Sequence, residues 1–455
     1  MSGERLSALD AGFLAVERPG TPMHIGWVAT FDPPADGAAP DFAALQAHIA
    51  ARMARAPRFR QRLAGVPLGL HGPVWVDATR FDPAAHLHHA PGEELDTIVD
   101  PILSSPLARD RPLWEMWIAD GLRDGRIGLI GKAHHCMVDG AAVVELGNVL
   151  LDRDPEPPPP RGDVPLAAPT PSAGERLGRA ALDRTADAAA IAIAPVRLAG
   201  SPERLRRLPA GLRRGARVLG HTVLPPAPGS FLNRRGSALR RHERVTRPLS
   251  ELREVRRRFG VTPNDVVLAT CAGALRRLAE RRGEPPVPLK AMVPADVRSS
   301  DDDAGAGNRI AFVFIHLPCD EPDPVARLRA VHAATDQRRR DGEAEDVDAA
   351  FQALSRAPGP VQRVLAEAFA HPRLFNLTVS SIAGPAVPRH LLGCRLREVH
   401  SAVPLTGRHA LSLSVVTVAG HACFSVYADA AALPDADALG HDLGAALDEL
   451  VSASP

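Results

Sequence analysis

The stretch Gly131–Gly140, GKAHHCMVDG, sets a local fold around which the rest of the chain can be arranged. A β-rich run leads into two adjacent histidines, and the Asp-Gly pair then closes a turn into a predicted helix, Ala141–Leu151. Neighbouring side chains on an extended segment point to opposite faces. We therefore expect only one of His134 and His135 to enter a given cleft, while the other packs against the protein or orients the motif.

Segments upstream of this stretch alternate between strand and helix patterns. Strand-like runs at Leu113–Ile118 and Arg126–Ala133 flank a turn at Asp124–Gly125, and His24–Phe31 is also β-rich. Asp41–Met53 opens with a capping aspartate, and its apolar residues recur at a spacing of three to four, which is typical of a helix. Because strands and helices interleave throughout, the sequence predicts a mixed α/β fold.

A proline-rich segment, Asp152–Ala168, divides the chain. Proline at this density continues neither a helix nor a sheet ladder, so we predict a stiff linker. We expect an N-terminal lobe at residues 1–152, a crossover at 153–248 and a C-terminal lobe at 249–455. The second lobe contains a predicted helix after Asn264 and four β-rich runs: Val287–Pro294, Ile310–Leu317, Asn376–Ile382 and Leu411–Tyr427.

The crossover is strongly basic. The segment from Arg197 to Arg247 contains 13 arginines but only two acidic residues, Glu203 and Glu243, in a chain whose net charge is +1. If this segment is helical, four leucines fall on one face, which is typical of an amphipathic element on an anionic lipid surface. The same charge could instead steer an anionic substrate. A solvated linker in an arginine-rich chain is the alternative, since one proline and two glycines weaken the helix.

Composition excludes several classes of protein. With 45% hydrophobic and 24% charged residues, the chain is globular, and its near-zero net charge creates no field that attracts nucleic acid. Five cysteines without a CxxC pair predict a reduced protein with no zinc cage. The first residues lack the layout of a signal peptide. The longest apolar stretch, near Ala188–Val196, falls short of the ~20 residues that span a bilayer. We expect a cytoplasmic protein.

The two histidines leave several chemistries open. A histidine poised near neutral pH is a natural general base, whereas a buried pair with satisfied hydrogen bonds is the purely structural alternative. Zinc would need further ligands; His86, His88 and His89 are near in sequence, but no H-E-x-x-H pattern or cysteine set accompanies them. A Cys136–His135 nucleophile is disfavoured because adjacent strand residues face apart. No G-x-S-x-G, P-loop or Rossmann glycine pattern is present.

The motif HHCMVDG resembles the HHxxxDG motif of the bacterial wax ester synthase/diacylglycerol acyltransferase family, part of the superfamily of CoA-dependent acyltransferases and condensation domains. Other landmarks of that family follow in its order and cover both predicted lobes. They are Leu6–Gly26, the PLW element Pro112–Trp114, the ND element Asn264–Asp265, and the strand pair Met292–Pro318. The resemblance implies two chloramphenicol-acetyltransferase-like lobes joined by a long crossover, with an active-site channel at their interface.

The same resemblance implies a mechanism and roles for the motif residues. His135 would act as the general base that takes the proton of an acceptor hydroxyl as it attacks an acyl-CoA thioester, without metal or cofactor. His134 would orient the motif, and Asp139 would hold its turn by pairing with an arginine, for which Arg298 is the first candidate. Gly140 would let the backbone turn tightly before the helix.

Other matched positions suggest substrate contacts. Asn264 would donate its side-chain amide to the oxyanion, or else simply cap a helix. Arg298, Asn308 and Arg309 are candidate substrate-binding residues; the GNR segment that ends in Arg309 either fixes a turn between the lobes or contacts CoA phosphates. Ser381 and Gly384 complete this set of candidates.

The last landmark departs from the family. Ser380–Pro385 is SSIAGP where the family usually has SNVPGP, so Ser381 replaces asparagine and Ala383 replaces proline. The resemblance implies an O-acyltransferase that moves a long-chain acyl group from acyl-CoA to a diacylglycerol or fatty alcohol. The changed loop leaves two alternatives: a specialised alcohol or amine acceptor, and a catalytically silent lipid-surface binding protein. The expected partners are acyl-CoA, the lipid acceptor and a peripheral contact with the inner membrane or a lipid droplet, with no nucleic acid.

Overall fold

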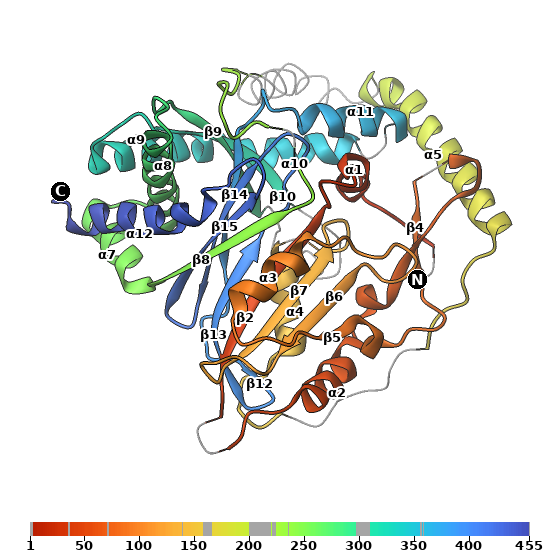
Figure 1. The fold of residues 1–455 in the computed structure, drawn as a ribbon. Helices are drawn as coiled ribbons and strands as arrows, with labels where there is room; N and C mark the ends of the chain where they lie inside the picture. The colour runs from red at the N-terminus through yellow and green to blue at the C-terminus, as the bar shows by residue number, and fades with distance from the viewer. Residues whose placement is uncertain are drawn as a thin grey trace.

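A computed structural model of the chain has two α/β lobes that lie against each other, each built on a six-stranded sheet (Figure 1). It describes residues 3–34, 37–70, 72–138, 140–157, 166–199, 220, 224–234, 236–296, 310–354, 357 and 359–454. The interleaved strands and helices confirm the mixed α/β fold that the sequence predicts.

The first sheet has the order β12–β13–β2–β7–β6–β5 and carries the histidine motif. All neighbouring strands are antiparallel except the pair β5 and β6. The strands are β2 (His24–Asp32), β5 (Leu87–His89), β6 (Trp114–Ala119), β7 (Ile127–His134), β12 (His390–Leu391) and β13 (Cys394–Ala402). Strand β7 is central, and its last residue is the first histidine of the pair.

Helices and a small sheet surround the first sheet. The helices are α1 (Ala8–Val16), α2 (Phe42–Met53), α3 (Leu95–Ser104) and α4 (Gly140–Leu150), with three short 3₁₀ turns at Pro57–Arg60, Pro67–Gly69 and Pro83–His86. The small sheet has the order β1–β4–β3, with β1 (Glu4–Arg5), β3 (Gln61–Ala64) and β4 (Val74–Asp77). The capping aspartate predicted for the second helix is confirmed, because the Asp41 side chain accepts from the Ala44 amide at 2.9 Å.

The second sheet has the order β10–β9–β11–β14–β15–β8. Its strands are β8 (Arg240–Pro248), β9 (Leu289–Asp296), β10 (Ile310–Leu317), β11 (Leu377–Ala383), β14 (Leu411–Val418) and β15 (His421–Asp429). The helices of this lobe are α7 (Leu249–Phe259), α8 (Pro263–Arg281), α9 (Pro324–Arg340), α10 (Glu343–Leu354), α11 (Gly359–Phe369) and α12 (Ala436–Ser452). The core of this lobe joins the largely buried helix α8 to α12 and to one face of the sheet.

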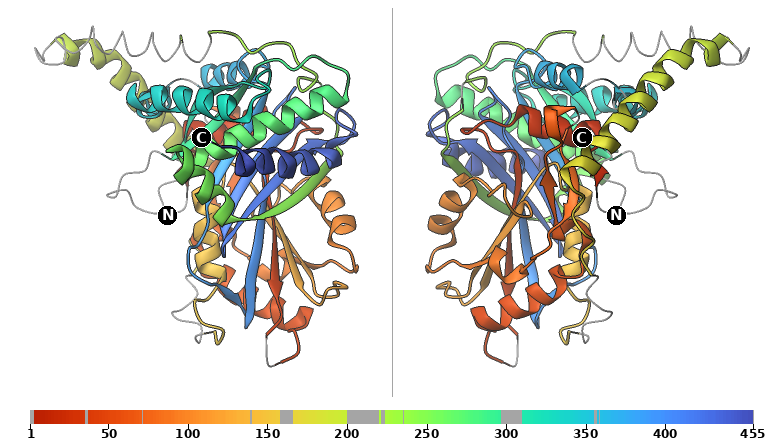
Figure 2. Two further views of the ribbon diagram at one scale, coloured as in Figure 1. Left: turned by 90° about the vertical axis from the view of Figure 1, so that its left-hand side faces the viewer. Right: turned by 90° about the vertical axis from the view of Figure 1, so that its right-hand side faces the viewer.

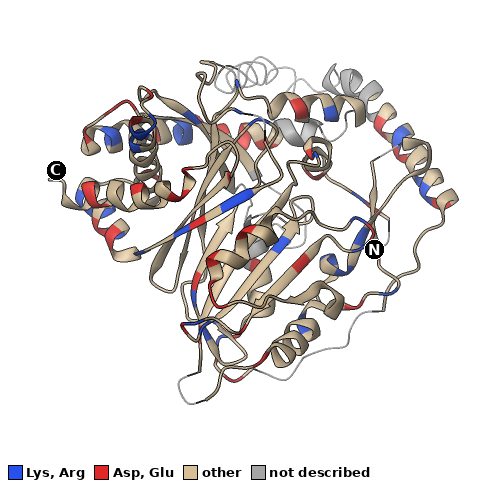
Figure 3. Ribbon diagram, viewed as in Figure 1, with Lys and Arg blue, Asp and Glu red and all other residues tan. Residues whose placement is uncertain are grey.

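Three strands, β8, β12 and β13, cross the boundaries that we expect from the sequence. Strand β13 lies far along the chain, yet it pairs with β2 and so belongs to the first sheet. Strand β8 ends the expected crossover and pairs with β15 at the edge of the second sheet. Strand β8 carries four arginines and one glutamate, and Figure 3 shows these charges along the strand. The C-terminal part of the chain therefore supplies two strands, β12 and β13, to the first sheet.

Two glycines let large side chains approach the first sheet closely. A Cβ atom on Gly131 would lie 2.1 Å from the ring of Trp27, its cross-strand partner. A Cβ atom on Gly26 would lie 2.6 Å from the Leu103 side chain of α3. Only residues without a side chain fit both positions, so these glycines fix how Trp27 and α3 pack around the strand that leads to the histidines.

The crossover is described only in part. Helix α5 (Ala173–Ala199) extends away from the body of the protein, as the two side views show (Figure 2). Most of the arginine-rich segment after it, with its four leucines, lies outside the described residues. Within the part of the chain that the structure describes, no helix is both long and apolar enough to span a bilayer.

Candidate active site

Strand β7 delivers the two histidines to the end of the first sheet. Its backbone pairs with β2 on one side and with β6 on the other, and His134 lies opposite His24 in the register. The chain then turns at His135, whose amide donates to the carbonyl of Met23 at 2.8 Å. The turn closes with a 2.8 Å bond from the Met137 amide to the His134 carbonyl.

His134 is held by a network of hydrogen bonds and charges. The Cys136 amide donates to Nδ1 of the ring at 3.1 Å, and the Arg109 guanidinium lies 3.4 Å from Nε2. That nitrogen lies 3.4 Å from Oε1 of Glu17, which also accepts from the Met23 amide at 3.1 Å. Burial, and then the Arg109 charge, lowers the pKa of His134 to about 3. Glu17 and Arg109 themselves form an ion pair. His134 is therefore a neutral ring whose two nitrogens both face groups of the protein, and its orienting role stays a prediction.

His135 occupies a different environment. Its ring stacks face to face on Phe13 of α1, with ring centroids 3.8 Å apart and planes inclined by 14°. Burial lowers its pKa to about 4, against hydrogen bonds with the backbone of His135 itself and of Val138, which raise it. The imidazole is consequently neutral at pH 7, which is the protonation state that a general base requires.

A buried lysine and a third histidine support this end of the sheet. Lys132 is fully buried, and its ammonium donates to the carbonyl and the hydroxyl of Ser105 at 2.7 and 2.6 Å and to the Ile102 carbonyl at 3.1 Å. His24 Nε2 donates to the next carbonyl, that of Leu103, at 2.9 Å. These carbonyls end helix α3, where the helix dipole is negative and backbone acceptors have no partner within the helix. Strands β2 and β7 are thereby fixed to α3 beside the two histidines.

The environment of Cys136 disfavours a thiolate nucleophile. Burial, followed by the nearby charge of Asp10, raises the pKa of the Cys136 thiol well above its ordinary value. Among the described residues, no group of three or more histidine, cysteine, aspartate and glutamate side chains could hold a metal ion. His86, one of the histidines considered for zinc, instead has its Nδ1 2.8 Å from the Trp114 carbonyl and stacks on the Trp114 ring.

Asn264 lies in the first turn of α8, in the second lobe. The expectation that it caps this helix is wrong: Thr262 is the N-cap, and Thr262 and Asp265 form a reciprocal capping box. The buried Asp265 carboxylate also accepts from His332 at 2.7 Å and from Thr335 at 2.6 Å. Sequence spacing alone did not separate the three polar residues at this helix start. A role for Asn264 as oxyanion donor stays a prediction.

The remaining predicted residues fall into two groups. Ser381 is exposed on β11, opposite Val415, and the Gly384 amide donates to the Thr417 carbonyl at 2.9 Å. A Cβ atom on Gly384 would lie 2.8 Å from that same carbonyl, so the glycine that SSIAGP retains allows the close approach. Gly140 begins α4. Asp139, Arg298, Asn308 and Arg309 lie outside the described residues, so their assigned roles stay predictions.

Sequence reasoning missed the helix that covers the histidines. Asp10, Phe13 and Glu17 recur at helical spacing in and just after α1, and they act on Cys136, His135 and His134 respectively. The sequence carried a signal in that spacing, since residues three, four and seven apart share a helix face. Nothing local indicated which surface this face would contact.

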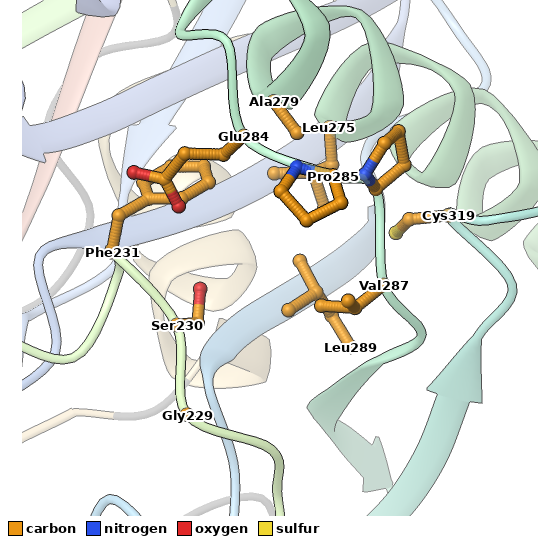
Figure 4. Close-up of a pocket in the computed structure, with 11 residues that line it drawn as sticks. Gly229, Ser230, Phe231, Leu275, Ala279, Glu284, Pro285, Val287, Leu289 and Cys319 are labelled. Carbon is orange, nitrogen blue, oxygen red and sulfur yellow. The ribbon is translucent and has the colours of Figure 1, made fainter.

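Three cavities among the described residues lie away from the histidines. The first, of about 410 Å³, lies between Arg5 and helix α5 and is lined by Arg179 among others, and two more involve the second lobe. One, of about 120 Å³, is formed between α8 and the start of β9 (Figure 4). Its lining is mainly apolar and includes Phe231, Leu275 and Leu289, with the Glu284 carboxylate at one side. The other, of about 590 Å³, lies between the lobes at the opposite end of β7 and is lined by Arg126, Glu243 and Glu398 among others. None of the three contains a residue that the sequence pointed to as catalytic.

Comparisons with known proteins place the chain in a family. Residues 6–267 match the wax ester synthase/diacylglycerol acyltransferase catalytic domain, and residues 306–451 match the C-terminal domain of the same family. A Mycobacterium tuberculosis (strain ATCC 25618 / H37Rv) protein, provisionally named as a diacylglycerol O-acyltransferase, is 33% identical over 467 residues, covering 99% of this chain and 91% of the relative. Another from that strain, a "probable" diacylglycerol O-acyltransferase, is 30% identical over 461 residues, covering 99% and 96%.

Solved structures give the same result for the fold. The wax ester synthase/diacylglycerol acyltransferase from Marinobacter aquaeolei VT8 superposes with a TM-score of 0.69 at 24% identity, covering 99% of this chain and 98% of that one. The first condensation domain of the calcium-dependent antibiotic synthetase superposes with a TM-score of 0.58 at 15% identity, covering 100% and 98%. The chain belongs to the wax ester synthase/diacylglycerol acyltransferase family, whose members are acyltransferases of lipid metabolism.

Proposed function

We propose that this protein is an acyl-CoA-dependent O-acyltransferase that transfers a long-chain acyl group to a diacylglycerol or a fatty alcohol. Membership of the family supports the reaction class, and its relatives' names support diacylglycerol as an acceptor. The observation that carries the mechanism is the buried, neutral ring of His135 at the end of β7.

In the proposed reaction His135 takes the proton of the acceptor hydroxyl as its oxygen attacks the thioester carbon. The tetrahedral oxyanion collapses, the carbon–sulfur bond breaks, and the imidazolium returns the proton to the CoA thiolate. The products are an ester and free CoA. Because burial keeps the imidazole neutral, the base is ready at pH 7. The same burial weakens the base, so proton transfer has to accompany attack rather than precede it.

In the proposed reaction His134 positions the motif and takes no part in proton transfer. Nε2 of His134 faces the Glu17 carboxylate, and Nδ1 accepts the Cys136 amide, so both ring nitrogens are committed to the protein. His134 thereby holds the backbone turn from which His135 projects. Positioning of this kind contributes to rate because the reacting atoms must approach within ~3–3.5 Å in a defined orientation.

The experiment that tests the function is an assay of the purified protein with palmitoyl-CoA and a panel of acceptors. Thiol release is followed continuously and the products are identified by mass. We expect turnover with dioleoylglycerol or hexadecanol and formation of the corresponding ester. Turnover with an amine, a sugar or a polyketide alcohol alone would instead establish the specialised-acceptor alternative, which the SSIAGP segment motivates. Absence of turnover with every acceptor would refute the proposal and favour a lipid-binding role.

We also propose a peripheral contact with a lipid surface, because both proposed acceptors reside in membranes or lipid droplets. Helix α11 presents three exposed apolar side chains at helical spacing, Val361, Val364 and Leu365, which are 44%, 63% and 41% exposed. Its other side packs on α1, the helix that covers the histidines. Flotation with phosphatidylglycerol vesicles tests this contact. Val364→Asp should reduce the bound fraction severalfold, and unchanged flotation would remove α11 as the contact.

A further inference from the structure

One short helix contacts both histidines of the motif. Helix α1 and the residue that ends it place Phe13 and Glu17 four positions apart, hence on one face, toward the turn after β7. Phe13 stacks on His135 and Glu17 faces His134. Asp10, on the same face, is 5% exposed and acts on Cys136. Three consecutive residues of the motif are therefore covered by three consecutive positions of one helical stripe.

The ring of Phe13 forms a flat platform on which the ring of His135 lies. Torsion about the bond that carries a histidine ring is soft, so the direction of its lone pairs is set by what the ring packs against. A centroid separation of 3.8 Å at 14° leaves no room for water on that face of the imidazole. The His135 amide is also tied to the Met23 carbonyl, and the Met23 amide to Glu17. Backbone and ring are thus fixed by the same segment.

Stacking has two opposed electrostatic effects on the base. Excluding water disfavours the imidazolium form, whereas the face of an aromatic ring attracts a cation. The lowered pKa of His135 shows that exclusion of water dominates in the free protein. The charged groups that act on the motif include Glu17 and Arg109, which pair with each other beside His134, and Asp10 and Arg58, which act on Cys136. The aromatic face remains available to the imidazolium when it forms during the reaction.

Resting on the proposed function, we propose that Phe13 is a positioning residue for His135, the platform that sets the plane of the base and shields it from water. Because α1 also packs on α11, with Gly12 facing Ala366, this platform is supported from the second lobe. Turnover would then depend on how α1 is seated between the lobes. Phe13 need not touch either substrate to have this effect.

The test compares Phe13→Leu, which keeps the apolar volume but removes the ring, with Phe13→Tyr, which keeps the ring. Phe81→Leu is the matched control, because the ring of Phe81 lies beside another histidine of the same lobe, His86, with ring centroids 5.7 Å apart. We expect Phe13→Leu to lower kcat about 10- to 100-fold, with KM for palmitoyl-CoA little changed. Phe13→Tyr should stay within about threefold of wild type, and so should Phe81→Leu. Thermal unfolding confirms that each variant is folded, and Phe13→Met replaces Phe13→Leu if it is not.

A second readout is independent of turnover. In protein labelled with ¹³C at histidine, His135 is assigned by the signal that His135→Gln removes, and its pKa is then titrated. We expect the pKa of His135 to rise in Phe13→Leu from about 4 toward its ordinary value, and the acid limb of kcat/KM to move with it. An unchanged titration and a kcat equal to that of Phe81→Leu would overturn the proposal. If no acceptor supports turnover, the proposed function fails, while the titration still decides the role of Phe13.

Discussion

Each lobe contains one buried lysine in a strand of its sheet, and the two lysines differ in the groups that surround them. The chain contains only two lysines, Lys132 in β7 and Lys290 in β9, and each is followed by alanine and fully buried. Burial lowers the pKa of both to about 8, and each ammonium lies over an aromatic ring, Trp117 at 4.8 Å and Phe314 at 5.5 Å. By their sequence context and their burial alone, Lys132 and Lys290 would be expected to contribute equally to stability.

Their partners make them different. Lys132 is joined to the end of α3 by three hydrogen bonds, and the Glu115 carboxylate lies 3.7 Å away. The partners of Lys290 include the Pro225 carbonyl, to which it donates at 3.0 Å; the Arg338 charge lowers its pKa and the Glu343 charge raises it, with Arg338 the stronger of the two. Strand β7 therefore carries a lysine that fixes the frame of the site two residues before His134. In β9 the corresponding position supports the packing of the crossover segment.

The first prediction concerns the stability of the folded protein at acid pH. The pKa values of His24, His134 and His135 are lowered to about 3, 3 and 4, so between those values and 6.5 the unfolded chain binds protons that the folded chain does not. Stability should be full above pH 6.5 and should fall as the pH drops toward 4, by up to about 1.4 kcal/mol per pH unit for each group.

Urea unfolding between pH 4.5 and 7 measures this slope. His24→Gln keeps a donor for the Leu103 carbonyl but cannot titrate. The dependence of the free energy of unfolding on pH should therefore decrease by the contribution of one histidine. A slope identical to wild type would mean that burial of His24 does not control the acid sensitivity of this end of the sheet.

The second prediction sets the two lysines directly against each other. Lys132→Met removes the buried ammonium that donates three hydrogen bonds to the end of α3, and we expect the free energy of unfolding to fall by about 3 kcal/mol. Lys290→Met should cost about 1–2 kcal/mol, since it also relieves repulsion from Arg338. Chemical denaturation at pH 7 compares both variants. Equal losses, or a larger loss for Lys290→Met, would contradict the distinction drawn between the lobes.

A third, smaller effect concerns the carboxylate that faces His134. Glu17→Gln keeps the shape of the side chain but removes the charge opposite Nε2, and we expect kcat to fall about 10- to 50-fold, about 2 kcal/mol in the barrier. Glu367→Gln is the control, because Glu367 pairs with Arg18 at the surface of α11. If both variants turn over palmitoyl-CoA at the same rate, Glu17 does not position the motif.

Much of the fold could be predicted because local patterns were strong. The strand expected at Ile310–Leu317 coincides with β10, and the strand expected at Arg126–Ala133 differs from β7 by one residue at each end. Leu411–Tyr427 is a hairpin that turns at Ala419 and Gly420, both with positive φ. The pairing of β13 with the first sheet could not be predicted, because it depends on contacts between distant segments.

The same division applies to the site. The two histidines were found from their motif, and the helix start at Thr262–Asp265 from its polar residues. The roles of Phe13 and Glu17 were missed, since they follow from how α1 lies across the end of β7 rather than from any local propensity. Burial of His135, which sets its protonation state, is likewise a property of the packed protein.

The central claim is that one neutral imidazole, that of His135, acts as the base for acyl transfer. The most direct test is thiol release from palmitoyl-CoA by His135→Ala with the best acceptor of the panel. His86→Ala serves as a control for removal of a buried histidine from the same lobe. We expect His135→Ala to lose about 10²–10⁴-fold in rate while remaining folded, and His86→Ala to retain turnover. A folded His135→Ala protein that releases thiol as fast as wild type would contradict the account.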